Sequence, residues 1–213
     1  MDVDVETHAH HHKTGHSIID LSVALSALVL SVVSVVIAIH HGHTMEKLVA
    51  ANSWPSIELS ESNADEQGHY DLRLRVANVG IGPARIEKFI VRYDGVAVGD
   101  ARDLLQRCCG TAGLPPEQQP LLTTSAVLGR VLPARETIDF LHFRYDEASA
   151  DTWHRLDAAR SHLVMQVCYC SVFDECWIGD SSTAPPKRAE SCDALAGRDY
   201  GDGDVPASRP AAP

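Results

Sequence analysis

Basic residues are scarce in this chain of 213 residues. It has 18 Lys and Arg against 29 Asp and Glu, and its formal net charge is −11. A nucleic-acid binder neutralises phosphates with clustered Lys and Arg, so this charge balance argues against that class of function. We therefore expect no nucleic-acid partner.

Recognisable catalytic motifs are also missing. The sequence has no Gly-x-Ser-x-Gly elbow, no Gly-x4-Gly-Lys phosphate loop, no His-Glu-x-x-His, no kinase signature and no redox Cys-x-x-Cys. Asp151, His154 and Asp157 share one face of a predicted helix, but such a face is typical of a solvated helix side. We predict that the protein is not an enzyme, and a hydrolase with scattered catalytic residues is the alternative.

The chain does contain one long apolar run. Residues 21–39 carry no charge, and four serines are the only polar side chains among Leu, Val, Ile and Ala. As a helix this run is about 28 Å long, close to the ~30 Å of a bilayer's hydrocarbon core. It predicts a single transmembrane helix over residues 18–40, with the lipid bilayer as a partner.

Two alternatives to a membrane anchor exist. A buried helix of a soluble domain would need protein on every face. A cleaved signal peptide would use the small residues Val49, Ala50 and Ala51, but the apolar run is longer than a signal core and ends well before them. The flanking charges are nearly balanced and do not set the orientation, whereas the six cysteines favour an oxidising compartment. We expect a bacterial inner-membrane protein with a periplasmic C-terminal domain.

A face of small residues follows the predicted helix. Alternating steps of three and four residues select Ala24, Ala27, Ser31, Ser34 and Ala38, and then His41, Met45, Leu48 and Asn52. Ala and Ser let a second helix approach closely within lipid. The pattern predicts a homo-oligomer or association with another membrane protein, although such residues are also frequent in spanning helices.

Beyond the helix the periodicity changes from helical to extended. The dipeptide Trp54-Pro55 should stop the helix, and residues 70–76 alternate between apolar and charged. Further strands are expected at residues 85–93, 96–98, 127–132, 137–144 and 162–172, with Asp94-Gly95 as a hairpin turn and helices at 101–107 and 148–160. About seven short antiparallel strands with short helices indicate a mainly β chain that forms a β-sandwich.

These signals divide the chain into five predicted regions. They are a His-rich disordered tail at 1–17, the transmembrane helix at 18–40, a juxtamembrane helix at 41–54, the β-sandwich domain at 55–180 and a disordered Pro/Gly-rich tail at 181–213.

Three stretches carry a resemblance to a known group. Residues 44–55 (TMEKLVAANSWP), 74–84 (LRVANVGIGPA) and 168–177 (CYCSVFDECW) resemble uncharacterised bacterial single-pass membrane proteins with a C-terminal immunoglobulin-like β-sandwich domain. The similarity covers roughly residues 17–180. It implies this architecture and carries over no catalytic or binding residue.

Six cysteines lie in the C-terminal part of the chain. Neighbouring Cα atoms are about 3.8 Å apart, shorter than a relaxed disulfide requires, so Cys108 and Cys109 should pair elsewhere. A five-residue connection sets Cys170 opposite Cys176 and predicts that bridge, and Cys192 can tie the tail to the domain. The alternative is a zinc site built from Cys168, Cys170, Cys176 and either Cys108 or Cys109.

Histidines gather on both sides of the apolar run. The N-terminal cluster consists of His8, His10, His11, His12 and His16, and His40, His41 and His43 follow the run. Imidazole clusters bind zinc or nickel, so metal handling by the N-terminal cluster is the alternative function; otherwise we expect no cofactor. A spanning helix would keep the two clusters about 30 Å apart.

Together these patterns predict a membrane-anchored, non-enzymatic binding or assembly module that associates with itself through its helix. The predicted contact regions are the loop at 108–122 and the turn at 170–177. Phe173 and Trp177 in that turn are either exposed contact residues or, in the simpler interpretation, core residues.

Overall fold

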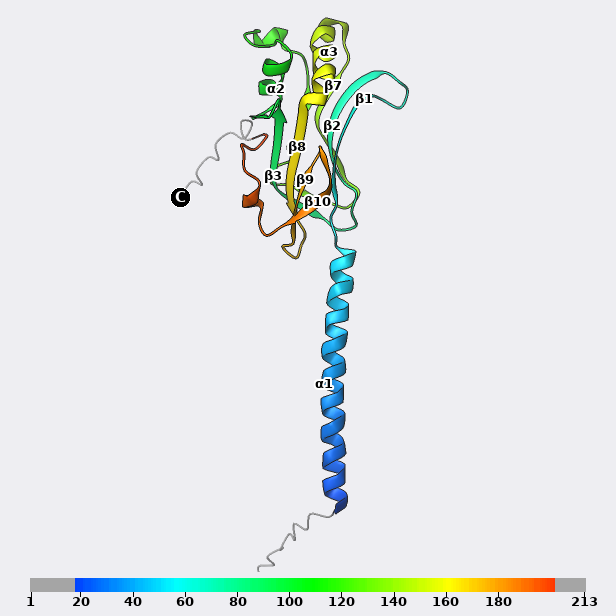
Figure 1. Ribbon diagram of the computed structural model, residues 1–213. Coiled ribbons are helices and arrows are strands. Elements are labelled where there is room, and N and C mark those ends of the chain that lie inside the picture. Colours follow the sequence, from blue (N-terminus) through cyan, green and yellow to red (C-terminus); the bar gives the residue numbers. More distant parts are fainter. Residues whose placement is uncertain (1–17, 202–213) are drawn as a thin grey trace, which may run out of the picture. The chain divides into compact units, whose positions relative to one another are not determined.

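A computed structural model describes residues 18–201 of the chain (Figure 1). The chain divides into two compact units, Met1–Val49 and Ala50–Pro213. The first described element is a single unbroken helix, α1 (Ile18–Asn52), which includes both predicted helical segments. It ends two residues before Trp54, as expected from the proline at position 55. No residue of α1 is buried, and the helix is long and apolar enough to cross a membrane.

The second unit holds two antiparallel sheets (Figure 1). One sheet has the order β1-β2-β7-β5, formed by β1 (Ile57–Ala64), β2 (Tyr70–Asn78), β7 (Thr137–Arg144) and β5 (Thr123–Thr124). The other has the order β10-β9-β8-β3-β4, formed by β10 (Thr183–Ala189), β9 (Cys176–Asp180), β8 (Leu163–Cys170), β3 (Ala84–Tyr93) and β4 (Val96–Val98). The short strand β6 (Val131–Leu132) also pairs with β3. The antiparallel prediction is confirmed.

Alternation along the strands explains which side chains form the core. In β2, Leu72, Leu74 and Val76 are fully buried while Arg73 and Arg75 stay partly exposed, as the period of two predicts. Strand β7 has an irregular register beside Leu74, so Phe140 and Leu141 are both buried.

Aromatic rings join the two sheets. Phe89 of β3 meets Phe140 of β7 edge to face with ring centroids 4.9 Å apart, and Tyr200 packs on both rings. These side chains belong to one apolar cluster that takes residues from both sheets. The two sheets therefore share a core.

Two helices connect the strands. Helix α2 (Ala101–Cys108) begins at Asp100, whose side chain accepts a hydrogen bond from the backbone of Asp103. Helix α3 (Ala150–Ala159) buries Trp153, whose indole N–H donates to the Phe143 carbonyl at 3.0 Å. Single-turn 3-10 segments are η1 (Pro116–Gln118), η2 (Glu147–Ser149), η3 (Arg160–His162) and η4 (Cys192–Ala194).

The hairpin predicted at Asp94-Gly95 is present between β3 and β4. Both residues have positive φ, 49° and 79°, which is the conformation of a type I′ turn.

The disordered tail predicted from residue 181 is wrong for residues 181–201. This segment contains β10 and η4, and it buries Leu195 and Tyr200. The composition of this segment favours disorder, but two interactions order it: β10 pairs with β9, and Cys192 forms a disulfide with Cys168. Residues 202–213 lie outside the described residues.

Two further sequence expectations need correction. The predicted strand at 127–132 is reduced to β6, and β1 was not predicted. β1 is rich in Ser, Glu and Asn, which have low strand propensity, and it is held by pairing with β2 from Ile57 to Ala64.

Candidate functional site

The predicted metal residues His8, His10, His11, His12 and His16 lie outside the described residues. The small-residue face, Ala24, Ala27, Ser31, Ser34 and Ala38, lies on α1, where all five side chains are exposed. The hydroxyls of Ser31 and Ser34 donate to carbonyls four residues back, both at 2.8 Å. The face thus presents no unpaired hydroxyl hydrogen.

Cys170 and Cys176 form a disulfide of 2.02 Å, the pairing expected from the turn length, and Cys192 is bonded to Cys168. The expectation that adjacent Cys108 and Cys109 pair elsewhere is wrong, because they are bonded to each other. Cys109 follows the last residue of α2 and leaves the helical conformation (φ −126°, ψ 7°), which lets its side chain turn toward its neighbour.

A sulfur cluster is the described group best suited to a metal. The sulfur atoms of Cys170, Cys176 and Cys192 all lie within 4.8 Å of one another. The fourth nearby sulfur belongs to Cys168, not to Cys108 or Cys109 as the zinc alternative assumed. All four are disulfide sulfurs, and only their reduction to thiolates would supply zinc ligands.

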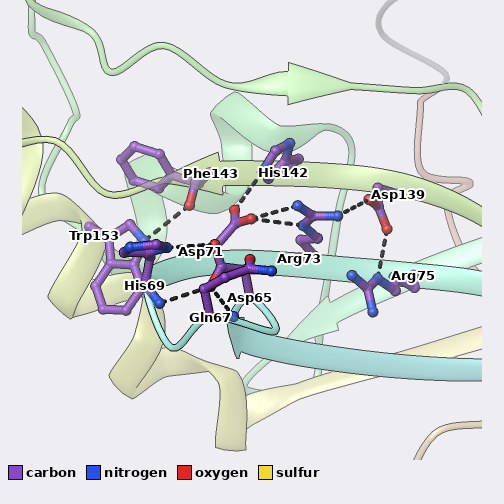
Figure 2. Close-up of polar contacts among 10 residues, drawn as sticks. All are labelled: Asp65, Gln67, His69, Asp71, Arg73, Arg75, Asp139, His142, Phe143 and Trp153. Carbon is purple, nitrogen blue, oxygen red and sulfur yellow. Dashed lines mark hydrogen bonds and ion pairs between the residues drawn. The ribbon is translucent and has the colours of Figure 1, made fainter.

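A charge ladder covers the outer face of the four-stranded sheet (Figure 2). It consists of Asp71, Arg73, Arg75, Asp139 and His142, from β2 and β7. The Arg73 guanidinium donates to Asp71 at 2.6 Å and to Asp139 at 3.3 Å, and Arg75 donates to Asp139 at 2.8 Å. His142 contacts the second oxygen of Asp71.

Asp71 is the most buried member of the charge ladder, at 3% exposed. Burial of its carboxyl opposes ionisation, but hydrogen bonds from Arg73 and His142 outweigh burial and hold its pKa below the ordinary value of 3.8. A hollow of about 550 Å³ lies beside the ladder, lined also by His69 and Arg144. Each ladder carboxylate already accepts from an arginine, so the ladder's strong interactions are internal.

The helix face with Asp151, His154 and Asp157 is solvated, as predicted, because Asp151 and His154 are exposed and Asp157 is half-buried. The Asp157 carboxylate is paired with Arg160 at 2.8 Å and accepts from the Asn63 amide at 3.0 Å. His154 packs edge to face on Trp153. The bond from Asn63 ties α3 to β1.

An aromatic groove lies where β1 begins beside β9 and β10. It is defined by Trp54, Ile81, Tyr169, Trp177, Pro185 and Pro186 and has a volume of about 400 Å³. The Trp177 ring stacks between the rings of Trp54 and Tyr169. Its centroid lies 6.0 Å from that of Trp54 and 5.8 Å from that of Tyr169. Burial raises the pKa of the Tyr169 phenol above its ordinary value of 10.0, partly offset by a backbone hydrogen bond from Ile57, so the groove floor stays uncharged.

The turn between β2 and β3 fixes Trp54 in place. The Trp54 carbonyl accepts from the backbone N–H groups of Ile81 and Gly82, both at 3.1 Å. A Cβ on Gly82 would lie 1.9 Å from the Ser53 carbonyl oxygen, and one on Gly80 would lie 2.4 Å from the Ser56 nitrogen. Only glycine permits this close approach of two backbones.

Asn78 completes this anchoring. It is fully buried, and its amide nitrogen donates to the carbonyls of Gly82, at 2.8 Å, and Leu132, at 3.0 Å. Its amide oxygen accepts from the backbone of Gly80 and of Ser56. The Asn-x-Gly-x-Gly pattern visible in the sequence is thus the support of the groove.

Sequence reasoning identified some groove residues and missed others. Trp177 is half-buried in the groove, whereas Phe173 is 50% exposed, so core placement is wrong for Phe173. Pro185 and Pro186 were assigned to a disordered tail. Their alternative signal was the Cys192 that follows them, because a disulfide there fixes the intervening strand.

In comparisons with known proteins, no family model, no curated protein and no solved structure matches this chain. Its function is therefore inferred from its own residues.

Proposed function

We propose that this chain is a single-pass, membrane-anchored binding and assembly module without enzymatic activity. The observation that carries the proposal is α1, whose large apolar side chains from Ile18 to Ile39 are all between 48% and 86% exposed. Apolar side chains on every face of a helix require an apolar surrounding, and lipid supplies it.

The polar groups of α1 are compatible with lipid. The four serines of the apolar run each donate to a carbonyl of the preceding turn, at 2.8–2.9 Å. Within a bilayer every hydrogen-bonding group needs a partner in the protein, and these hydroxyls have one.

Self-association through the small-residue face is the second part of the proposal. Ala27, Ser31 and Ser34 leave room for close approach of a second helix, and packing between helices in lipid depends on such contact. A homo-oligomer would present several copies of the domain together.

The domain is proposed to be a β-sandwich of the immunoglobulin-like kind in the periplasm of a bacterium. The shared core around Phe89 and Phe140 supports the two-layer arrangement. The disulfides Cys168–Cys192 and Cys170–Cys176 favour an oxidising compartment.

Membrane fractionation and topology reporters test the anchor. We expect the full-length chain to stay in the membrane pellet until detergent is added, and reporters fused after Pro213 to be active only outside the cytoplasm. Unclipped full-length chain in the supernatant would refute the anchor, and an active cytoplasmic reporter would refute the orientation.

A substitution pair tests self-association. Ala27→Leu with Ser34→Leu fills the small-residue face and should shift the detergent-solubilised protein toward monomer in analytical ultracentrifugation. Ser22→Leu with Ser26→Leu adds similar bulk away from this helix face and is the matched control. Equal oligomeric state in both variants would remove the face from the proposal.

A further inference from the structure

In the aromatic groove the domain leaves one aromatic ring largely open, that of Trp54, which stacks on Trp177. Trp54 is 57% exposed, Pro185 is exposed, and Pro186 lies beside Trp177 in the groove lining. The indole N–H groups of Trp54 and Trp177 donate to no other described residue. Stacked aromatic rings with free N–H donors are the surface that recognises polyproline II segments, whose prolines pack on rings and whose carbonyls accept hydrogen bonds.

The groove continues toward acidic side chains. A second hollow of about 420 Å³ shares Ser56 and Pro186 with it and is lined also by Glu58 and Asp180. Burial opposes ionisation of Asp180, but hydrogen bonds from Ser182 and Gln166 outweigh burial and hold its pKa below the ordinary value of 3.8. A ligand that combines prolines with a basic residue would match both hollows.

Strands on both sides of the groove are at the ends of their sheets. β1 ends the four-stranded order and β10 ends the other, and the proline pair in β10 interrupts its register with β9. Proline on an edge strand prevents continuous strand addition. This favours a ligand that binds through side-chain surfaces over one that extends β10.

The chain's own last residues have the matching composition. Residues 205–213 read Val-Pro-Ala-Ser-Arg-Pro-Ala-Ala-Pro, with Arg209 directly before a Pro-x-x-Pro motif formed by Pro210 and Pro213. Prolines fix φ near the polyproline II value, so little conformational entropy is lost on binding.

The tether is long enough to reach the groove. The last described residue, Gly201, donates to the carbonyl of Gly99, just after β4. From β4 to β10 there are four strand spacings, or about 19 Å. Pro210 is nine positions after Gly201, and an extended chain over nine Cα–Cα steps spans roughly 30 Å.

We propose that residues 206–213 bind in the aromatic groove of the same chain as a polyproline II ligand. The prolines lie on the exposed ring of Trp54 and against the edge of Trp177, whose two faces are covered by Trp54 and Tyr169, and Arg209 faces Glu58 and Asp180. This inference rests on the binding module proposed above and assigns its ligand class: proline-rich segments that carry a basic residue. The chain's own tail competes with such segments for the groove.

A peptide titration on the full chain in detergent micelles tests this assignment. The probe is a fluorescent peptide of residues 203–213, and the readout is its polarisation. The first two proteins are the wild-type chain and a chain whose own tail is disabled by Arg209→Glu, Pro210→Ala and Pro213→Ala.

We expect the peptide to bind the tail-disabled chain about tenfold more tightly than the wild-type chain. A tail tethered at an effective concentration of about 1 mM outcompetes a peptide with a dissociation constant near 0.1 mM by that factor. Adding Trp54→Ala to the tail-disabled chain should abolish binding. Phe173→Ala removes an exposed aromatic outside the groove lining and should leave binding unchanged.

Three results of the titration at a single protein concentration would overturn the assignment. They are no binding to the tail-disabled chain, equal affinity for the wild-type and tail-disabled chains, and equal losses from Trp54→Ala and Phe173→Ala. Competition that grows with protein concentration would also overturn it, because the ligand would then be the tail of a second copy. The titration reads neither membrane insertion nor helix association, so its failure is distinct from failure of the proposed function.

Discussion

Two of the hollows on the domain differ in their chemistry, one of about 550 Å³ over β2 and one of about 400 Å³ beside Trp54. In the first, the lining residue Asp71 is paired with Arg73, and the lining residue Arg75 is paired with Asp139 beside the hollow. In the second, aromatic rings and a proline pair face outward without such partners. The larger hollow holds the stronger charges, yet they interact with one another. The aromatic groove, whose rings and prolines lack such partners, is therefore the better candidate for a binding surface, although its volume is smaller.

We expect the largest effect from removing the Cys168–Cys192 disulfide, which closes the segment that contains β10. Cys168→Ser with Cys192→Ser opens a loop of sequence separation 24 and should lower the free energy of unfolding by about 3.5 kcal/mol. It should also weaken tail-peptide binding, because Pro185 and Pro186 lie in the released segment. Urea denaturation measures the first effect and the peptide titration the second.

Opening the shorter loop provides the control for that variant. Cys170→Ser with Cys176→Ser, at sequence separation 6, should cost about 2.3 kcal/mol. If the double variant at residues 168 and 192 kept the wild-type affinity for the peptide, peptide binding in the groove would not depend on the Cys168–Cys192 disulfide.

Gly82→Ala should have the next largest effect. Its Cβ would lie 1.9 Å from a backbone oxygen of Ser53, which cannot rotate away, so we expect a loss of about 2–3 kcal/mol and weaker peptide binding. Gly179→Ala meets only a Val167 methyl at 3.4 Å and should change stability by less than about 1 kcal/mol. Equal midpoints in urea for both variants would contradict the close-approach explanation.

Asp71→Asn tests the hollow beside the charge ladder instead of the aromatic groove. It replaces a buried carboxylate that accepts from Arg73 and His142, and it should cost about 2 kcal/mol in urea denaturation. The exposed Glu66→Gln is the control and should leave stability unchanged. Neither variant should alter tail-peptide binding; an altered affinity would mean that the two hollows are energetically coupled.

Acid should produce the smallest effect. The folded pKa values of Asp71 and Asp180 lie below 3.8, so their ionised forms stabilise the folded state. That stabilisation is fully present above 3.8 and is lost as the pH falls through the lower folded values. Urea midpoints measured from neutral pH downward should fall in this range, and the fall should be shallower in Asp71→Asn. An unchanged slope would remove Asp71 as a source of acid sensitivity.

Local signals in the sequence were sufficient for several elements. The end of α1 before Pro55, the Asp94-Gly95 hairpin, α2, α3 and the Cys170–Cys176 pair each depend on residues close together in the chain. The polar pattern of β1 and the prolines of β10 do not indicate strands. β1 forms because it pairs with β2, and β10 forms because it pairs with β9. Local residue propensities do not predict such pairing between strands.

The candidate site shows the same limit. Trp54 and Trp177 were both recognised as notable residues, but their contact requires β1 and β9 to lie together, which periodicity cannot predict. Likewise, Arg73 and Arg75 were expected on the outer face of β2. Their partner Asp139 follows from the register between β2 and β7, including its irregularity.

The groove depends on one buried neutral amide, that of Asn78. Its amide nitrogen contacts the carbonyls of Gly82, Leu132 and Pro133 in a fully buried site, and an Asn78→Asp substitution would replace that donor with a negatively charged oxygen. The new carboxylate would repel the carbonyls of Gly82 and Leu132. Loss of a single amide would then loosen the turn below Trp54 and the end of β6 together.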